Sequence, residues 1–430
     1  MDWQVVVVGA GAAGLLAAAR AAERGRRTLL LEKNRHPGVK ILMSGGTRCN
    51  LTHAADRRGI VQEFGDQGRF LHSALAALSP QDLVELFERE GVATKIEPDT
   101  GKVFPASDKA ADVLDALLAR LRRSGCTLAL EEPLVAFERA GEKGFRLTTS
   151  KRTLTAEKVL ITTGGQSYPG SGTSGDAYAW AAAFGHTIVP PRPALTPITT
   201  DAAWVRELQG VTIPDVFVRV VETKPEEQPE TSPAKGAGRA KRRGRGFLAE
   251  RRGSFLFTHF GLSGPVVLDV SRVVSGHRQP RSLVLQCDFL PQIGEAELEE
   301  RIKQEAAAAG KKQLGGLLAS LLPRRLTDAL LAQLDLPPER KLAELSRADR
   351  ARFVAAIKRQ PIAVSGTRGF KKAEVTAGGV ALDEVDSRTM QSLKAPNLYF
   401  AGEVLDLDGP IGGYNFQAAF CTGWLAAESM

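Results

Sequence analysis

The chain has 430 residues, of which 43% are hydrophobic and 25% charged, so it can bury the cores of more than one structural unit. Aromatic residues make up only 6%, which disfavours a protein built mainly on base-stacking platforms. Its apolar runs are shorter than the roughly 18 residues of a membrane-spanning helix, and its first residues lack a basic leader. We therefore expect a cytoplasmic protein with no membrane partner.

The cysteines are widely scattered and form neither a CxxC pair nor a metal-ligand spacing. They are Cys49, Cys126, Cys287 and Cys421. This pattern disfavours zinc sites, iron–sulfur sites and a disulfide framework, so we expect no bound metal and a reducing compartment.

The net charge of +8 is concentrated in one segment. Between Lys235 and Arg252 there are eight lysines and arginines against one acid, Glu250. The surrounding residues 224–252 are rich in proline, glycine and charge, with almost no large apolar side chains. Such a composition predicts a disordered basic loop.

The first residues form one βαβ unit. Residues 4–8 (QVVVV) are typical of a buried parallel strand, an Ala/Leu-rich helix follows Gly14 to about Glu23, and residues 28–32 predict the second strand. Beyond this unit we expect helices at 80–91 and 108–124, antiparallel strands within 133–150, a strand at 158–163, short strands from about 190 to 290, helices within 294–358, strands at 375–385 and 397–401, and a helix within 411–429.

A glycine fingerprint joins the first strand to its helix. Gly9 permits the tight turn, Gly11 lets a pyrophosphate approach the backbone, and Gly14 lets the helix pack on the sheet. Glu32 ends the second strand, where its carboxylate can accept hydrogen bonds from ribose hydroxyls. The pattern predicts dinucleotide binding and, by itself, fits NAD and FAD equally.

Two glycine-rich turns favour a cofactor with a flat ring. Residues 42–50 read LMSGGTRCN, a polar loop that can present backbone N–H groups and an arginine to a ring or a phosphate. Thr162-Thr163-Gly164-Gly165 ends an apolar strand and lets the chain pass close to a cofactor.

The C-terminal motif decides between the two dinucleotides. Ala401-Gly402-Glu403 precedes Asp406 and Asp408, and a helix starts after Gly412-Gly413. That helix would aim its positive end at the flavin pyrimidine oxygens and stabilise negative charge on the reduced ring. This arrangement favours FAD, and the lack of a second full glycine fingerprint predicts that any NAD(P)H docks transiently over the flavin.

Together these motifs resemble the bacterial NAD(P)/FAD-dependent oxidoreductase family, whose members include YhiN, BaiN, aminoacetone oxidase-like flavoproteins and ribosomal RNA dihydrouridine synthase. The resemblance rests on GAGAAG, SGGTRCN, GKVFP, TTGGQSYPGSGTSGD, LFTHFGLSGP, VTAGGV and AGEVLDLDGPIGGYNFQAA. It implies an α/β fold in which a Rossmann-like FAD-binding domain (1–190 and 361–430) is split by a β-rich domain (191–293) and a small helical domain (294–360).

The resemblance also implies which residues contact FAD. Two positions depart from the family pattern, because Thr47 stands where the loop usually has a third glycine and Phe416 where leucine is frequent. The implied contacts are Gly9, Gly11, Ala13, Gly14, Glu32, Lys33, Ser44, Gly45, Gly46, Arg48, Cys49, Asn50, Val135, Thr163, Gly164, Gly165, Gly402, Glu403, Asp408, Gly412, Gly413, Tyr414, Asn415 and Gln417.

The family implies NAD(P)H-driven reduction of a uracil base in 23S ribosomal RNA to dihydrouridine. Cys49 is a candidate proton donor, because a thiol beside a flavin can donate a proton, and the alternative, which we favour, is that it is only a small buried loop residue. His259 is a second candidate that also fits a plain strand end. The basic segment 235–252 would attract RNA phosphates or would only aid solubility.

Two other functions stay open on sequence alone. One is oxidation or reduction of a small metabolite, such as an amino ketone or an unsaturated sterol acid. The other is a non-catalytic flavin-containing protein that binds RNA. Turnover on RNA should fall steeply with salt, whereas turnover on a small neutral metabolite should not.

Overall fold

The computed structural model describes residues 1–141, 144–223, 247–319 and 321–430. It divides into two compact units: unit 1 comprises Met1–Ala194 and Gly369–Met430, and unit 2 comprises Leu195–Arg368. The β-rich and helical segments expected as separate domains therefore both lie in unit 2, and the chain leaves and re-enters unit 1 a few residues later than expected.

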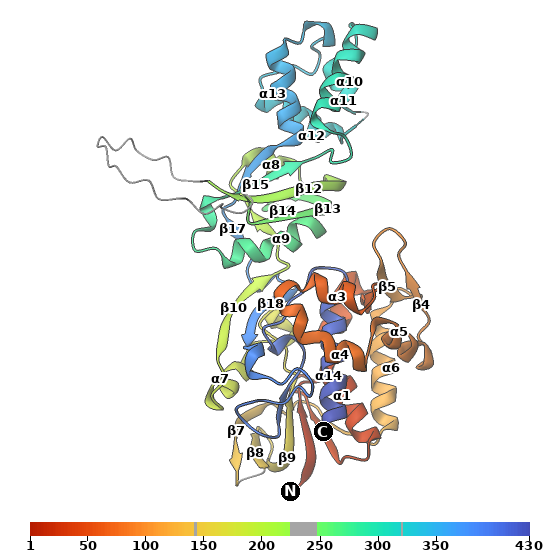
Figure 1. The fold of residues 1–430 in the computed structure, drawn as a ribbon, viewed down its shortest axis with the longest axis vertical. Helices are drawn as coiled ribbons and strands as arrows, with labels where there is room; N and C mark the ends of the chain where they lie inside the picture. The colour runs from red at the N-terminus through yellow and green to blue at the C-terminus, as the bar shows by residue number, and fades with distance from the viewer. Residues whose placement is uncertain (142–143, 224–246, 320) are drawn as a thin grey trace, which may run out of the picture. The chain divides into compact units, whose positions relative to one another are not determined.

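A Rossmann-like sheet forms the centre of unit 1. Its strand order is β6-β2-β1-β9-β8-β7, with β19 also paired to β9, and β1 runs parallel to β2 and β9 (Figure 1). The bounds are β1 Trp3–Val8, β2 Thr28–Leu31, β6 Thr127–Ala129, β7 Leu134–Ala140, β8 Gly144–Thr149, β9 Thr153–Ile161 and β19 Leu398–Phe400. The β-branched run of β1 is buried on both faces, as a central parallel strand requires.

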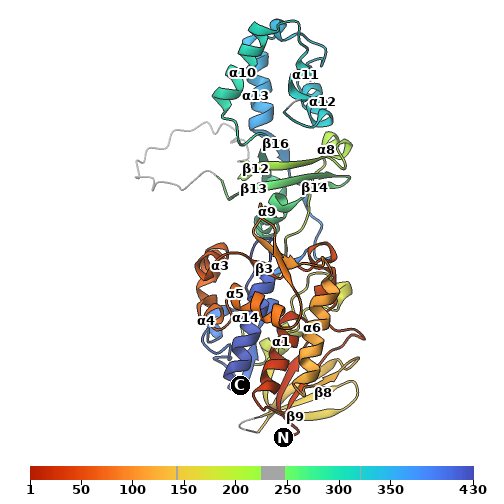
Figure 2. The same ribbon diagram turned by 90° about the vertical axis from the view of Figure 1, so that its right-hand side faces the viewer.

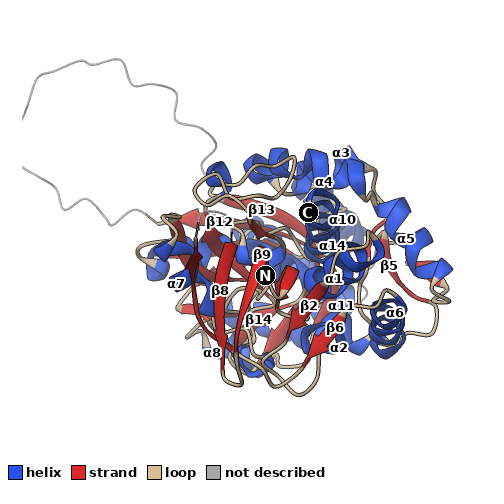
Figure 3. Cartoon of the chain, turned by 90° about the horizontal axis from the view of Figure 1, so that it is seen from below, coloured by secondary structure: helices blue, strands red, loops and turns tan. Residues whose placement is uncertain are grey.

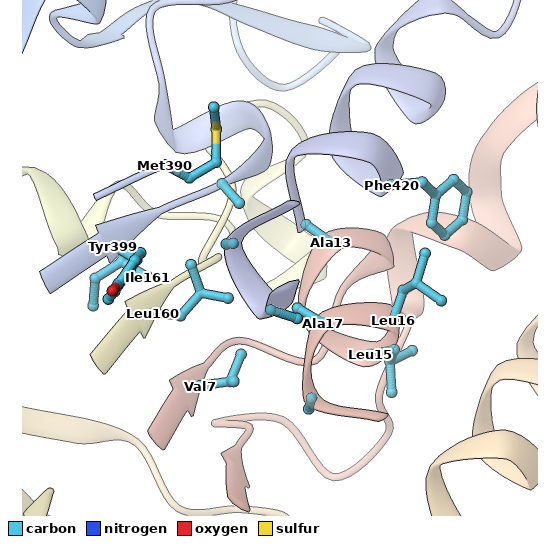
Figure 4. Packing of buried hydrophobic residues seen from close by; sticks show 14 of the residues in the cluster. Val7, Ala13, Leu15, Leu16, Ala17, Leu160, Ile161, Met390, Tyr399 and Phe420 are labelled. Carbon is cyan, nitrogen blue, oxygen red and sulfur yellow. The ribbon is translucent and has the colours of Figure 1, made fainter. Parts of the chain in front are cut away.

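Two helices from opposite ends of the sequence pack together on this sheet. Helix α1 (Ala12–Glu23) lies against helix α14 (Tyr414–Ser429), and both are seen on one side of the strands in Figure 3. Their small residues allow a close approach: a Cβ on Gly423 would lie 2.6 Å from the Ala13 carbonyl oxygen. Figure 4 shows Leu16 of α1 and Phe420 of α14 in the same apolar layer.

The remaining elements of unit 1 surround this core. A three-stranded sheet has the order β3-β5-β4, and β10 pairs with β18 in a two-stranded sheet. The expected strand 375–385 is shorter than predicted, because a 3₁₀ turn replaces it at Leu382–Glu384. The bounds are α2 Val39–Met43, β3 Thr52–His53, α3 Arg57–Glu63, α4 His72–Ala77, α5 Pro80–Arg89, β4 Thr94–Ile96, β5 Lys102–Pro105, α6 Ala110–Arg123, α7 Asp176–Ala183, β10 Ile188–Ala194 and β18 Val375–Val380.

Unit 2 combines a seven-stranded antiparallel sheet with helices. Strands pair in the order β16-β15-β12-β13-β14-β11-β17, helix α9 packs on β13, and helices α10 to α13 lie beyond β16 (Figure 2). The bounds are β11 Ile198–Thr199, α8 Ala203–Glu207, β12 Thr212–Glu222, β13 Ala249–Thr258, β14 Gly261–Ser263, α9 Pro265–Gly276, β15 Leu283–Asp288, α10 Glu295–Ala308, α11 Leu314–Ala319, α12 Arg324–Gln333, α13 Arg347–Lys358, β16 Gln360–Ala363 and β17 Gly366–Thr367.

The expected disordered loop 224–252 lies mostly outside the described residues. Its last part is different from the prediction: residues from Ala249 onwards form β13, where Arg251 pairs with Val218 and Arg252 with Phe217 of β12. The expectation of disorder is wrong for residues 249–252, because ladder hydrogen bonds to β12 order them despite their charge. Within the described residues, no helix is long and apolar enough to span a bilayer.

Candidate functional site

The glycine turn between β1 and α1 is closely packed on one side and open on the other. Gly9 has φ +104°, and a Cβ there would lie 2.7 Å from the Thr162 carbonyl oxygen. A Cβ on Gly14 would lie only 1.9 Å from the Gly9 carbonyl oxygen. At Gly11, by contrast, a Cβ would meet no atom within 4 Å, so the surface of this residue is free for a ligand to approach.

The N-terminus of α1 suits a diphosphate. Gly11 is its N-cap, no side chain caps its first N–H groups, and its first turn holds no acidic residue. These N–H groups and the helix dipole attract an anion. The open surface of Gly11 beside an uncapped helix end therefore fits the pyrophosphate of FAD.

Glu32 organises the turn where a ribose would lie. Its carboxylate accepts hydrogen bonds from the backbone N–H groups of Ala10 and Asn34, both at 2.8 Å. The Glu32 carbonyl oxygen accepts a hydrogen bond from the N–H of Glu132. Glu132, three residues before Val135, therefore lies beside Glu32. The Val135 side chain itself is 62% exposed.

Lys33 ties the loop after β9 to the end of β2. Its Nζ donates to Ser174 Oγ at 2.7 Å and to Asp176 Oδ2 at 2.5 Å. Burial opposes ionisation of the Asp176 carboxyl, but hydrogen bonds from Lys33 and Ser174 outweigh it and lower the pKa of that group. The Lys33 ammonium is thus bonded to side chains of the protein itself, at the place where we expect the adenosine of FAD.

The loop expected beside the isoalloxazine has an unusual backbone. Gly45, Gly46, Thr47 and Cys49 all have positive φ, at 55°, 67°, 70° and 61°. Gly46 has open space around it, as Gly11 does. Thr47, the departure from the family pattern, therefore occupies a left-handed position that disfavours a β-branched residue.

Arg48 is held by the neighbouring hairpin. Its guanidinium lies 3.9 Å from the ring centroid of Phe104, and its Nη1 lies 2.8 Å from Glu97 Oε1 and 3.6 Å from Asp108 Oδ1. These contacts fix the arginine against β4 and β5, and its side chain keeps 38% exposure toward solvent.

Asn50 joins this loop to the start of α14. With its amide oriented to satisfy the surrounding groups, its oxygen accepts from the Gly413 N–H at 2.9 Å and its nitrogen donates to Thr52 and Val103 carbonyl oxygens. Nearby, Thr52 Oγ1 donates to Gln417 Oε1 at 2.7 Å, and Gln417 is fully buried. Asn50 and Gln417 thus connect N- and C-terminal motifs.

Four segments meet at the carboxylate of Glu403. Its Oε1 accepts from Ser167 Oγ at 2.7 Å and from the Thr376 N–H at 2.9 Å, and its Oε2 pairs with the Lys40 ammonium. Lys40 also donates to Ser167 Oγ at 2.7 Å. A Cβ on Gly165 would lie 2.4 Å from Thr376 Oγ1, so the Gly164-Gly165 turn is closed on that side.

Sequence reasoning placed Glu403 at the cofactor and missed Lys40, Ser167 and Thr376. No short-range pattern connects these three residues, which are separated by more than 100 positions. Two of them could have been found from the motifs, since Ser167 continues the turn after Gly165 and Thr376 lies in VTAGGV.

The C-terminal motif bends through three further glycines before α14. Gly402, Gly412 and Gly413 have φ values of 75°, 125° and 92°. Tyr414 stacks on His53 with ring centroids 4.8 Å apart. Asn415 holds the preceding loop by bonding both the N–H and the carbonyl of Gly409.

Asp408 and Ala13 lie in the interior of unit 1, with 3% and 5% exposure. Thr163 and Gly164 follow β9, where Gly164 has φ +75°.

The motifs of the first 165 residues and of the last 30 are joined in one unit by hydrogen bonds between their own side chains and backbones. Most polar side chains expected on FAD are engaged in this way, which leaves open backbone at Gly11 and Gly46 to face a cofactor.

The two candidate proton donors lie in different units. Cys49 has no exposed surface, and burial raises the pKa of its thiol to about 12. His259 is exposed in the turn between β13 and β14 of unit 2, where its ring contacts Phe260 at 4.9 Å. Their catalytic roles stay predictions. Across the described residues, no group of His, Cys, Asp and Glu side chains is arranged to hold a metal.

Comparison with known proteins places this geometry in a family. Residues 3–429 match the family described as HI0933-like protein Rossmann domain. A ribosomal RNA dihydrouridine synthase of Escherichia coli is 34% identical over 431 residues, covering 100% of this chain and 98% of the relative. A 3-dehydro-bile acid delta(4,6)-reductase of Clostridium scindens is 29% identical, covering 99% and 98%.

Solved structures are more distant. A 3-ketosteroid-delta4-(5alpha)-dehydrogenase from Rhodococcus jostii superposes with a TM-score of 0.46 at 14% identity, covering 99% of this chain and 96% of that one.

When bound, FAD supplies hydride transfer, and Gly9, Gly11 and the α1 N-terminus would hold its diphosphate. The chain belongs to the HI0933-like family of Rossmann-domain proteins and is an FAD-dependent oxidoreductase.

Proposed function

We propose that this oxidoreductase uses NAD(P)H to reduce a uracil base of 23S ribosomal RNA to dihydrouridine. The observation that carries the proposal is the full-length match to the Escherichia coli ribosomal RNA dihydrouridine synthase, with 34% identity over both chains. A second relative of the same name, from Haemophilus influenzae, is 31% identical over 431 residues.

The local chemistry supports a ring-reducing flavoenzyme. We propose that FAD lies along Gly9–Gly14, passes Glu32 and Lys33 with its adenosine, and reaches the Ser44–Asn50 loop with its ring. The positive end of α14 beside that loop would stabilise negative charge on the reduced ring. The eight basic residues between Lys235 and Arg252 would attract RNA phosphates without reading sequence.

A direct test uses ribosomal RNA from cells that lack this gene. The purified holoprotein is incubated with that RNA and either NADH or NADPH, and nucleosides are quantified by mass spectrometry. We expect dihydrouridine to appear at the expense of uridine, with a rate that falls steeply as salt rises. RNA that stays free of dihydrouridine with both donors would contradict the proposal.

The Clostridium relative supports a second candidate, reduction of a C=C bond in a small unsaturated sterol acid. Both reactions add a hydride and a proton across a conjugated double bond. The second candidate predicts turnover of a 3-oxo-4-ene steroid that is insensitive to salt, because a neutral ring system releases no counterions on binding.

A further inference from the structure

One sequence motif lies outside the unit that carries the glycine turns. LFTHFGLSGP spans residues 256–265 of unit 2, whereas the other motifs of the resemblance lie in unit 1. It forms the end of β13, a turn at His259 and Phe260, strand β14 and the start of α9. The proposed binding of FAD makes no use of this turn, so its exposed side chains are free for another role.

The turn between β13 and β14 is firmly held. Thr258 pairs with Gly261 across it, and Thr258 Oγ1 donates to the Gly261 carbonyl at 2.9 Å. Gly261 has φ +143°, and a Cβ there would lie 2.4 Å from the carbonyl oxygen of Ile198 in β11. Strand β11 therefore packs closely against the backbone of the turn and fixes its position.

Strand β17 brings Arg368 to this turn. β17 pairs with β11, and the N–H of Arg368, directly after β17, donates to the Pro197 carbonyl at 3.0 Å. The Arg368 guanidinium lies over the Phe260 ring, 4.6 Å from its centroid. The His259 ring meets the Phe260 ring at 79°, with centroids 4.9 Å apart. We call these three side chains the Phe260 cluster.

The cations of the cluster differ from a similar one in unit 1. Arg48 also lies over a phenyl ring, that of Phe104, but Glu97 neutralises it at 2.8 Å. Arg368 and His259 are exposed, and neither side chain makes a hydrogen bond or ion pair within the described residues. Their donor groups are therefore available to a ligand.

The neighbouring surface adds positive charge. The Phe260 carbonyl accepts from the Thr200 N–H at 3.4 Å, and the Thr200 carbonyl accepts from Arg206 Nη2 at 3.0 Å. Asp201 lies 3.5 Å from Arg206 and 3.6 Å from Arg281, so this one carboxylate faces two guanidinium groups. Together with the guanidinium of the cluster, these side chains carry a net positive charge that attracts an anion.

This combination of groups suits a nucleotide. A guanidinium can bond the oxygens of a phosphate, and its flat face can carry a nucleobase. The phenyl ring beside Arg368 restricts the guanidinium, so less conformational entropy is lost when it binds a ligand. Single-stranded RNA repeats an anionic group and a flat base at every nucleotide, whereas a neutral 3-oxo-4-ene steroid offers no anion to this arginine.

We propose that the Phe260 cluster binds one nucleotide of the ribosomal RNA other than the uracil that is reduced. Arg368 and His259 donate hydrogen bonds to its phosphate, and its base stacks on the exposed side of the guanidinium. The inference rests on the proposed function, because it takes RNA as the substrate. In this role His259 is a hydrogen-bond donor to the RNA backbone, and the cluster contributes to RNA affinity without touching the reacting atoms.

The test measures binding without turnover. A fluorescein-labelled single-stranded oligouridylate is titrated with the oxidised holoprotein, without NAD(P)H, at several concentrations of potassium chloride, and fluorescence anisotropy is recorded. Arg368→Gln should weaken binding about tenfold at low salt. Its plot of log association constant against log salt should be shallower by about 0.7, the value for one phosphate contact on a single strand.

Arg324→Gln is the matched control for charge. Arg324 lies in α12 with 85% of its side chain exposed, and its replacement removes the same charge from unit 2. We expect its affinity and its salt dependence to stay those of wild type. Thermal unfolding of both variants should match wild type, because both arginines are exposed.

Phe260→Leu tests stacking separately from charge. It should weaken binding of the oligouridylate by about 5–100-fold and binding of an abasic oligonucleotide much less, because the abasic chain has no base to stack. Phe217→Leu is the control: Phe217 is a half-buried ring of β12 in the same unit, with the Arg219 guanidinium 4.9 Å from its centroid. This control should leave both affinities unchanged.

The outcomes distinguish this inference from the proposed function. If Arg368→Gln has the same affinity and salt dependence as Arg324→Gln, the Phe260 cluster does not bind RNA, while the proposed function stands. If wild type does not bind the oligouridylate at any salt concentration, the inference is overturned as well. Formation of dihydrouridine in ribosomal RNA then decides the proposed function independently.

Discussion

The Ser44–Asn50 loop of unit 1 and helix α10 of unit 2 differ in the sequence separation of the polar contacts that hold them. In α10, acidic and basic side chains four residues apart pair along the surface, as Glu297 does with Arg301 at 2.7 Å. In the loop, four of seven residues have positive φ, and Asn50 is bonded to Gly413, more than 350 positions away. The ion pairs of the helix join neighbours in sequence while Leu298 and Ile302 are buried in the core of unit 2, whereas the backbone of the loop depends on polar contacts with a distant part of the chain.

This difference shows where function constrains the fold. Local pairing such as that of α10 tolerates change, because each exposed pair contributes only about 0.3–0.5 kcal/mol. The loops of unit 1 depend on close backbone packing and on shared hydrogen bonds, so one substitution there affects several motifs together. The following predictions test that contrast, from the largest expected effect to the smallest.

The glycine turn offers the sharpest pair of substitutions. Gly14→Ala forces a Cβ to within 1.9 Å of the Gly9 carbonyl, and we expect it to lower the free energy of unfolding by about 1–3 kcal/mol or more and to abolish FAD binding. Gly11→Ala meets no protein atom, so thermal unfolding of the apoprotein should stay unchanged while FAD affinity falls at least about tenfold. Equal stability losses in both apoproteins would contradict this account.

The Lys40–Glu403 pair should matter more than any surface pair of unit 2. Lys40→Met keeps the stem but leaves a partly buried carboxylate without its cation, and we expect FAD to dissociate about tenfold more readily, or about 1.4 kcal/mol. Lys303→Met, on exposed α10, is the control and should not change FAD affinity. Adding Glu403→Gln to Lys40→Met should restore part of the loss; additive losses, measured by fluorescence titration of FAD, would argue against a direct coupling.

The smallest effect is expected at Thr47. Replacing it by glycine relieves a positive φ but adds chain entropy to the unfolded state and removes the hydrogen bond from Thr47 Oγ1 to the Gly46 carbonyl. We expect a net gain of at most about 1 kcal/mol in calorimetry. Thr153→Gly, in strand β9, should instead lose about 0.5–1 kcal/mol. A destabilised Thr47→Gly would show that the strain at this position is negligible.

Much of the fold was predictable because its signals are local. The β-branched run of β1, the glycine fingerprint and the Ala/Leu pattern of α1 predict the βαβ unit, and the helical spacing within 294–358 predicts α10 to α13. Residues 249–252 were misassigned because their composition is that of a loop, while pairing with β12, a tertiary effect, makes them a strand.

The site was predictable at the level of motifs but not of side-chain roles. Glu32, Asn50, Glu403 and Gln417 were expected on the cofactor, yet their polar atoms bond mainly to other motifs. Sequence alone cannot distinguish a side chain that touches a ligand from one that shapes the backbone around it.

The pairing of β19 with β9 and of α14 with α1 has a consequence for biosynthesis. During translation the first 194 residues emerge with an unfinished sheet edge and an uncovered apolar helix face, and they wait while all of unit 2 is made. Nascent chains halted before residue 398 should therefore engage chaperones, and acquisition of the yellow flavin should follow release from the ribosome rather than accompany elongation.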